Sequence, residues 1–173
     1  MRTFGPENAT LTVRTKRTGA ASKAGHDLLL EVTSWSATLD QDADPALTLT
    51  ADSSSLRVLE GTGGMQALDA DDRANIEQTI DDEVLTGTPI EFHSTRVEFG
   101  ADGGPTRVDG ELELAGERHP ITAELTTAED GRLTGTATVK QSDWGMKPYS
   151  ALFGALKVAD EVEVAVDIAP PGP

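Results

Sequence analysis

The sequence predicts a mainly β protein, an antiparallel sandwich or barrel of about eight strands that is interrupted by one helix. The main observation is a period-two alternation of apolar and polar residues, which is typical of strands with one buried face. In the stretch VEVAVDI, Val162, Val164 and Val166 share one face. Glu163 and Asp167 occupy the opposite face. Short polar or glycine-containing turns separate such segments, as they do in antiparallel sandwiches and barrels.

Eight segments are expected to form strands. They alternate between apolar and polar positions or are rich in residues that favour strands. The chain has no repeated alternation of strands and helices, which a parallel sheet would require. The expected strands are residues 9–15, 26–39, 46–51, 89–99, 111–114, 121–125, 133–140 and 162–168.

One segment, residues 67–85, has the spacing of a helix. Ile76, Ile80 and Val84 recur every four residues and would form an apolar stripe along one side of that helix. The aspartates within residues 69–72 lie where the amino terminus of a helix favours acceptors and negative charge. The sequence therefore predicts one helix of about four turns, at 3.6 residues per turn.

The length and composition fit a single domain. The domain is expected to cover residues 1–173, with an ordered part at about residues 8–169, and a chain of 173 residues can bury a core without disulfides. There is no cysteine, which excludes disulfides, thiolate metal sites and cysteine nucleophiles. The formal net charge of −16 opposes binding to nucleic-acid phosphates and to anionic membrane surfaces. Solubility is the simplest explanation of this acidity.

The first residues and the hydropathy of the chain bear on its cellular location. The first ten residues, MRTFGPENAT, lack the apolar run of a secretory signal, and no window approaches a membrane span. A cytoplasmic protein is therefore expected, and a periplasmic or secreted one only if the sequence were truncated. No membrane insertion is expected. A homodimer is compatible with the sequence, although no dimer face is recognisable in it.

Residues that would support catalysis, a cofactor or a metal are scarce. His26, His93 and His119 are far apart, whereas zinc sites show close histidine pairs, so each is interpreted as structural. His26 is expected to fix the start of its strand through backbone hydrogen bonds. The GTGG stretch at 61–64 lacks the Lys-Ser/Thr ending of a P-loop, and it is interpreted as part of a flexible lead-in at 60–66. No G-x-S-x-G motif occurs. No metal and no cofactor is expected.

Small residues on the expected inner faces suggest a container. Gly135, Ala137, Ala123 and Ala165 are all expected on apolar faces of strands. A closed barrel of about eight strands is just wide enough to be filled by side chains or to hold a small ligand. Two alternatives follow, which are an apolar cavity that receives an apolar ligand and an interior filled by the helix and the large rings.

Four stretches in order along the chain resemble the YceI-like, or polyisoprenoid-binding, family. QSDWGMKPYSALFGALKVADEVEVAVDIA (141–169) is similar to its carboxyl-terminal aromatic-glycine turn and final strand. TGAASKAGHDLLLEV (18–32) resembles its early Gly-His-Asp segment. DDRANIEQTIDDEVL (71–85) followed by TPIEFHS (88–94) is similar to its helix and next strand, and VDGELELAGERHPITAEL (108–125) to its short hairpin.

The resemblance implies an extended antiparallel lipocalin-like β-barrel with one α-helix. It also implies non-catalytic binding, storage or transport of a long isoprenoid, such as a polyprenyl lipid or an isoprenoid quinone, held lengthwise in the barrel. Two other functions remain open. One is an enzyme that acts on a hydrophobic substrate in the barrel, and the other is a filled-barrel interaction or stress-response module.

Three aromatic residues concentrated in one short loop are the main candidates for ligand contact. Trp144, Tyr149 and Phe153 fall within ten residues although aromatics are 4% of the chain. They are expected to line or close a mouth of the barrel, with a plug of the barrel end as the alternative. A polar head group is expected near a mouth, where His26, Asp27 or Tyr149 would form a hydrogen bond with it. The full set of expected ligand-binding residues is His26, Asp27, Phe92, Ala137, Trp144, Tyr149, Phe153 and Val164.

Overall fold

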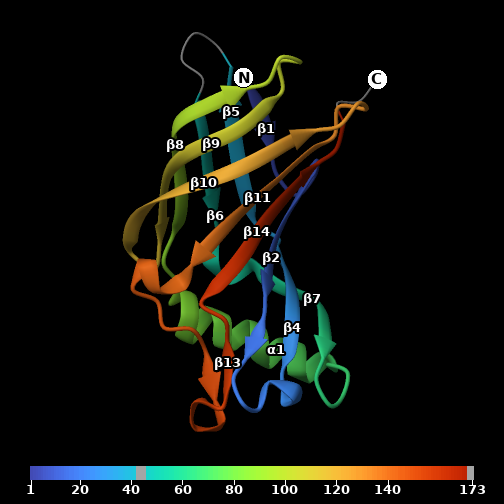
Figure 1. The fold of residues 1–173 in the computed structure, drawn as a ribbon, viewed down its shortest axis with the longest axis vertical. Helices are drawn as coiled ribbons and strands as arrows, with labels where there is room; N and C mark the ends of the chain where they lie inside the picture. Colours follow the sequence, from blue (N-terminus) through green and yellow to red (C-terminus); the bar gives the residue numbers. More distant parts are fainter. Residues whose placement is uncertain (42–45, 171–173) are drawn as a thin grey trace.

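The computed structural model describes residues 1–41 and 46–170. Eleven strands form one antiparallel sheet that curls strongly into a half-barrel (Figure 1). In their order across the sheet, the strands are β1 (Arg2–Phe4), β5 (Trp35–Asp40), β6 (Ala46–Ala51), β8 (Ile90–Phe99), β9 (Pro105–Leu114), β10 (Glu117–Thr127), β11 (Leu133–Lys140), β14 (Glu161–Ile168), β2 (Ala9–Thr15), β4 (His26–Val32) and β7 (Leu56–Gly63).

A second, small sheet stands at one end of the half-barrel. It has three strands in the order β12 (Ser150–Ala151), β13 (Leu156–Val158) and β3 (Arg17–Thr18). The helical elements are α1 (Ala70–Thr79), a π-helical continuation at Ile80–Leu85, and 3-10 turns at Ser22–Ala24, Ser53–Ser55, Gln141–Trp144 and Leu152–Gly154. Among the described residues, no helix is long and apolar enough to span a membrane.

The structure has more strands than the eight expected, partly because a bend divides one expected strand into two. Residues 26–39 were expected to form one strand, but Thr33 and Ser34 separate β4 from β5. The Thr33 amide and hydroxyl both donate to the Ser55 carbonyl, at 3.0 and 2.8 Å. The Ser34 amide donates to the Ser55 hydroxyl at 3.1 Å. Since β4 then pairs near one edge of the sheet and β5 near the other, this bend helps to curl the sheet.

The helix begins with reciprocal hydrogen bonds between two aspartates. The Asp69 carboxylate accepts from the Asp72 amide at 2.8 Å, and the Asp72 carboxylate accepts from the Asp69 amide at 3.2 Å. This capping box satisfies donors that the first turn leaves free, and it confirms the expected role of the acidic start. The predicted stripe of Ile76, Ile80 and Val84 packs against the core.

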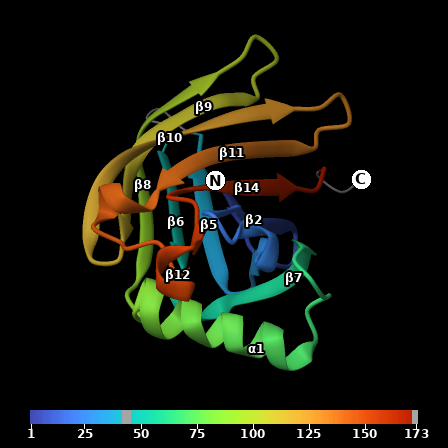
Figure 2. The ribbon, with the colours of Figure 1, turned by 60° about the horizontal axis from the view of Figure 1, so that its bottom comes forward.

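The helix closes one end of the half-barrel, where it covers the edge strand β7 (Figure 2). Arg73 donates to the carbonyls of Val58 and Leu59 at 3.0 and 2.9 Å. Glu77 accepts from the Val58 amide at 2.9 Å. These bonds occupy backbone groups that an edge strand otherwise exposes.

Strand β7 itself was missed by the sequence prediction, which placed a flexible lead-in at residues 60–66. The strand runs from Leu56 to Gly63 and pairs with β4 through a register shift at Leu29/Leu30. Gly61 and Gly63 hid it, because glycine is depleted in strands. Four short strands, β1, β3, β12 and β13, were also missed, and β1 precedes the expected start of the ordered part.

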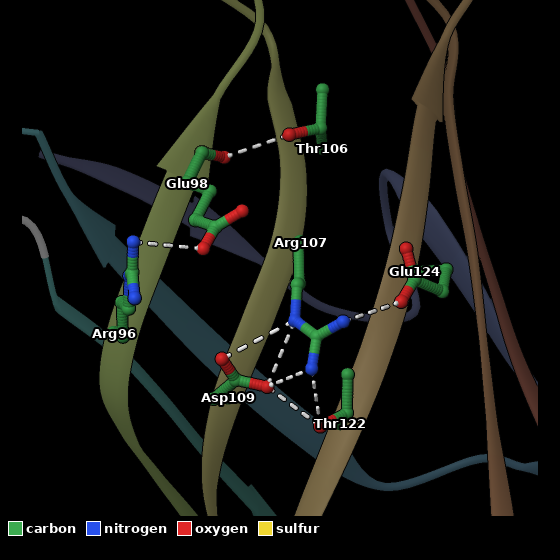
Figure 3. A network of polar contacts seen from close by, with 7 residues as sticks. All are labelled: Arg96, Glu98, Thr106, Arg107, Asp109, Thr122 and Glu124. Atoms are coloured by element: carbon green, nitrogen blue, oxygen red, sulfur yellow. Dashed lines mark hydrogen bonds and ion pairs between the residues drawn. The ribbon is translucent and has the colours of Figure 1, made fainter.

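The outer face of the sheet carries polar networks that cross neighbouring strands (Figure 3). On β9, the Arg107 guanidinium donates to Asp109 at 3.1 and 3.3 Å and reaches Glu124 of β10 at 3.2 Å. The Thr122 hydroxyl donates to Asp109 at 2.6 Å. The bonds from Arg107 and Thr122 lower the pKa of Asp109 below its usual value. The polar face of these strands is therefore turned outward, and their apolar face lines the interior.

Candidate functional site

The interior holds a cavity of about 660 Å³. It is lined by residues of all eleven strands of the large sheet, together with α1 and the segment that follows it. Cavities for small ligands are typically ~300–1,000 Å³. The expected alternative of an interior filled by side chains is therefore wrong for this structure.

Small side chains help to leave this volume open, as the sequence suggested. Gly135, Ala137 and Ala123 line the cavity. Ala165 does not, because it lies between two inward-facing positions of β14, Val164 and Val166, and therefore points outward. The assignment of Ala165 to the inner face was one residue out of phase.

The polarity of the lining differs between the two ends. Most polar lining residues gather at the end that carries α1 and the small sheet, and they include Arg17, His26, Asp72, Asn75, Tyr149 and Lys157. Lining residues toward the opposite end are apolar and include Phe4, Leu39, Val97, Pro105, Leu133 and Ile168. The cavity therefore suits a molecule that has one polar end and a long apolar remainder.

Five of the expected ligand-binding residues line the cavity. They are His26, Phe92, Ala137, Tyr149 and Val164. Four of them occupy alternate, inward-facing strand positions, which the period-two pattern predicts directly. Tyr149 reaches the cavity from the loop before β12 and is 41% exposed, so it lies at the mouth.

Asp27, one of the expected ligand-binding residues, does not line this cavity. It follows His26 in β4, so its side chain points to the other face of the strand. There its carboxylate accepts from the Arg17 amide at 2.8 Å. It also lies 3.7 Å from the Lys16 ammonium and 4.0 Å from the Arg17 guanidinium. Asp27 thus fixes β3 to β4.

Trp144 and Phe153 also lie outside the lining. Trp144 is buried, its indole N–H donates to the Leu112 carbonyl at 2.9 Å, and its ring meets the His119 ring edge-on at 5.6 Å. It therefore belongs to the packed end of the sheet, as the plug alternative proposed. Phe153 extends into solvent with full exposure. The three aromatics thus have three different environments.

His26 forms one of the backbone hydrogen bonds that were expected at the start of its strand. Its Nε2 lies 2.7 Å from the Gln66 carbonyl and donates to it, which ties the start of β4 to the loop before α1. A Cβ atom on Gly64 would lie 2.3 Å from this Nε2, so glycine is needed there. Among the described residues, no group of histidines and carboxylates is arranged to hold a metal ion.

Trp35 and Asn75 are two of the lining residues that were not expected from the sequence. Trp35 lines the cavity with 7% of its surface exposed, and its indole nitrogen has no hydrogen-bond partner within the described part of the chain. The alternation in WSATL, which places Trp35 beside Ala37 and Leu39, could have identified it. Asn75 of α1 also lines the cavity, and helix periodicity alone did not distinguish it from a solvent-facing residue.

The comparisons with known proteins agree with this architecture. The crystal structure of Burkholderia cenocepacia BcnA is similar with a TM-score of 0.56, at 16% identity over 92% of this chain and 94% of that one. A mutant CJ YceI protein with a monobromobimane guest gives a TM-score of 0.51, at 14% identity over 83% of this chain and 85% of that one. No curated protein matches the chain. The family model described as "YceI-like domain" matches residues 6–169. The chain therefore belongs to the YceI-like family, whose fold is lipocalin-like.

Proposed function

We propose that the protein binds a long isoprenoid, such as a polyprenyl lipid or an isoprenoid quinone, without transforming it chemically. The observation that carries the proposal is the apolar cavity of about 660 Å³ along the inside of the curled sheet. Burial contributes about 0.8 kcal/mol for each methylene group, so a chain of several isoprene units needs few polar contacts.

The polar end of the ligand would lie beside α1. Arg17, His26, Asn75 and Tyr149 supply hydrogen-bonding groups there, whereas the opposite end offers almost only hydrocarbon. Polar groups are stable in an apolar site only when they are paired, which favours this orientation over the reverse.

An enzyme that acts on a hydrophobic substrate is the alternative to binding alone. Nε2 of His26 donates to the Gln66 carbonyl at 2.7 Å, so in this arrangement that nitrogen is a donor and does not act as a base. An enzymatic role would be favoured by turnover that His26→Ala abolishes while ligand binding persists.

Mass spectrometry of an organic extract from the natively purified protein tests the proposal. We expect a prenyl lipid or quinone in an amount comparable to the protein. Binding of added isoprenoids to protein refolded without lipid provides a second readout. A clean extract together with no binding of added isoprenoids would contradict the proposal.

A matched pair of variants tests the cavity itself. Ala137→Leu adds volume inside, whereas Thr138→Leu places the same side chain on the outer face of the same strand. We expect Ala137→Leu to weaken isoprenoid binding about tenfold or more, which corresponds to ~1.4 kcal/mol, and Thr138→Leu to leave it unchanged. Equal affinities of the two variants, with both proteins folded, would place the ligand elsewhere.

A further inference from the structure

Two segments of this acidic protein contain no acidic residue. They are residues 15–26 and 144–159, here together called the basic tip. The basic tip holds five of the 14 lysine and arginine residues and none of the 30 aspartates and glutamates. These cations are Lys16, Arg17, Lys23, Lys147 and Lys157.

The fold brings the two segments together. In the small sheet, Lys157 and Val158 of β13 pair with Thr18 and Arg17 of β3. The Ala21 amide donates to the Ala155 carbonyl at 2.8 Å, and the Ala159 amide donates to the Lys16 carbonyl at 2.7 Å. The loops of this sheet project past α1 at the lower end of the molecule (Figure 1).

The basic tip also exposes large apolar side chains. Phe153 is fully exposed and Leu152 is 58% exposed. Both adopt left-handed backbone conformations, with φ of 54° and 51°, and Gly154 follows with φ of 84°. Such conformations are unfavourable for residues other than glycine and persist where the surrounding structure imposes them. The turn thus holds two apolar side chains outward, although folding favours their burial.

Three of the cations are available to a partner. Lys23, Lys147 and Lys157 are exposed and have no ion pair with any residue that the structure describes. Lys16 and Arg17 share one carboxylate, that of Asp27. The tip therefore has a local positive charge despite the net charge of −16.

The basic tip adjoins the polar end of the cavity. Arg17, Tyr149 and Lys157 belong to the tip and also line the cavity. A surface that meets the tip would therefore face the mouth through which a ligand enters.

We propose that the basic tip docks on the surface of a membrane that contains anionic lipids, with Leu152 and Phe153 entering the interface, so that a ligand passes between bilayer and cavity. Exposed apolar side chains beside cations are the combination that binds such interfaces. The acidic surface elsewhere acts weakly on the docked tip, because exposed charges are screened beyond about 8 Å at physiological salt. The docking does not depend on the proposed isoprenoid binding, but the ligand transfer does.

Vesicle co-sedimentation tests the docking, with phosphatidylcholine vesicles that contain or lack phosphatidylglycerol. We expect the protein to bind the anionic vesicles and to be released by high salt. Removal of two cations that do not line the cavity, by Lys23→Gln and Lys147→Gln, should weaken binding about fivefold per charge. The control with the same charge change away from the tip, Arg96→Gln on β8 and Arg132→Gln before β11, should bind like the unchanged protein.

A second pair of variants tests the apolar contribution. Phe153→Asn removes the ring but keeps a residue that tolerates a positive φ, and Phe99→Asn removes a ring from the end of β8. We expect about tenfold weaker vesicle binding for Phe153→Asn and no change for Phe99→Asn. Since Phe153 is fully exposed, its loss should leave the unfolding temperature unchanged.

The outcomes separate docking from ligand binding. If the unchanged protein does not bind anionic vesicles, or if the tip variants and the controls bind alike, the docking is wrong and the tip serves another partner. Isoprenoid binding in the absence of vesicles should be equal in the tip variants and the unchanged protein. Its loss in all of them would overturn the proposed function and leave the vesicle result standing.

Discussion

Trp35 lines the cavity, and its indole N–H is buried without a hydrogen-bond partner in the described part of the chain. Leaving a buried donor unpaired costs about 1–3 kcal/mol, so native structures rarely keep one. The nitrogen has almost no accessible surface, so an acceptor oxygen on a bound ligand would remove this cost only after the indole turns toward the cavity. In that arrangement Trp35 would link the stability of the sheet to the chemistry of the ligand, because its ring packs in the core.

Trp35→Phe tests whether the indole N–H donates a hydrogen bond to an oxygen of the ligand. The variant keeps an aromatic ring and removes the N–H. We expect binding of an isoprenoid quinone to weaken about two- to tenfold, since a net hydrogen bond contributes ~0.5–1.5 kcal/mol. Binding of squalene, a hydrocarbon isoprenoid without oxygen, should not change. Titration calorimetry with both ligands gives the comparison, and an equal loss for both would mean that only packing was altered.

The segment from α1 to β8 shows what single elements contribute. The helix closes one end of the sheet through its stripe at Ile76, Ile80 and Val84, and it fixes β7 through Arg73 and Glu77. The stripe and the acidic start predicted this helix from sequence, because both are local signals. Its contacts with the β7 backbone could not be predicted, since β7 ends in glycines and was not recognised as a strand.

Asp69→Ala should destabilise the protein by about 1 kcal/mol, the usual contribution of a capping side chain. The Asp69 carboxylate accepts from the Asp72 amide at 2.8 Å, and alanine would leave that donor without this partner. The control Asp82→Ala removes the same charge from the segment after α1, where a negative charge is not favoured. Denaturant unfolding should show a lower midpoint for Asp69→Ala only, and equal midpoints would contradict the capping argument.

At the scale of the whole molecule, the sequence predicted which strand residues face the cavity. It did not predict how the aromatic loop and the small sheet are arranged at the end of the cavity. Period-two alternation placed Phe92, Ala137 and Val164 in the cavity, because it follows from strand geometry alone. The aromatic loop could not be resolved in this way, since Trp144 and Phe153 lie in irregular segments without a period. The pairing of β3 with β13 joins residues far apart in the chain, and no local pattern specifies it.

The volume of the cavity makes the stability of the molecule depend on its ligand. A cavity of about 660 Å³ leaves its lining without contacts that a bound chain would supply. At a ligand concentration of about 100 times Kd, binding to the native state alone adds ~2.7 kcal/mol to the free energy of unfolding. For a chain of this length that corresponds to a rise in Tm of about 5–11 °C, at ~2–4 °C for each kcal/mol.

Calorimetry on protein refolded without lipid, with and without an added isoprenoid, measures this rise. Ala137→Leu should show a smaller rise, because the leucine takes up part of the volume, and Thr138→Leu should show the full one. The basic-tip variants should also show the full rise, since their changes lie at or beyond the mouth of the cavity. An unchanged Tm at saturating isoprenoid would mean that this class of ligand does not stabilise the native state.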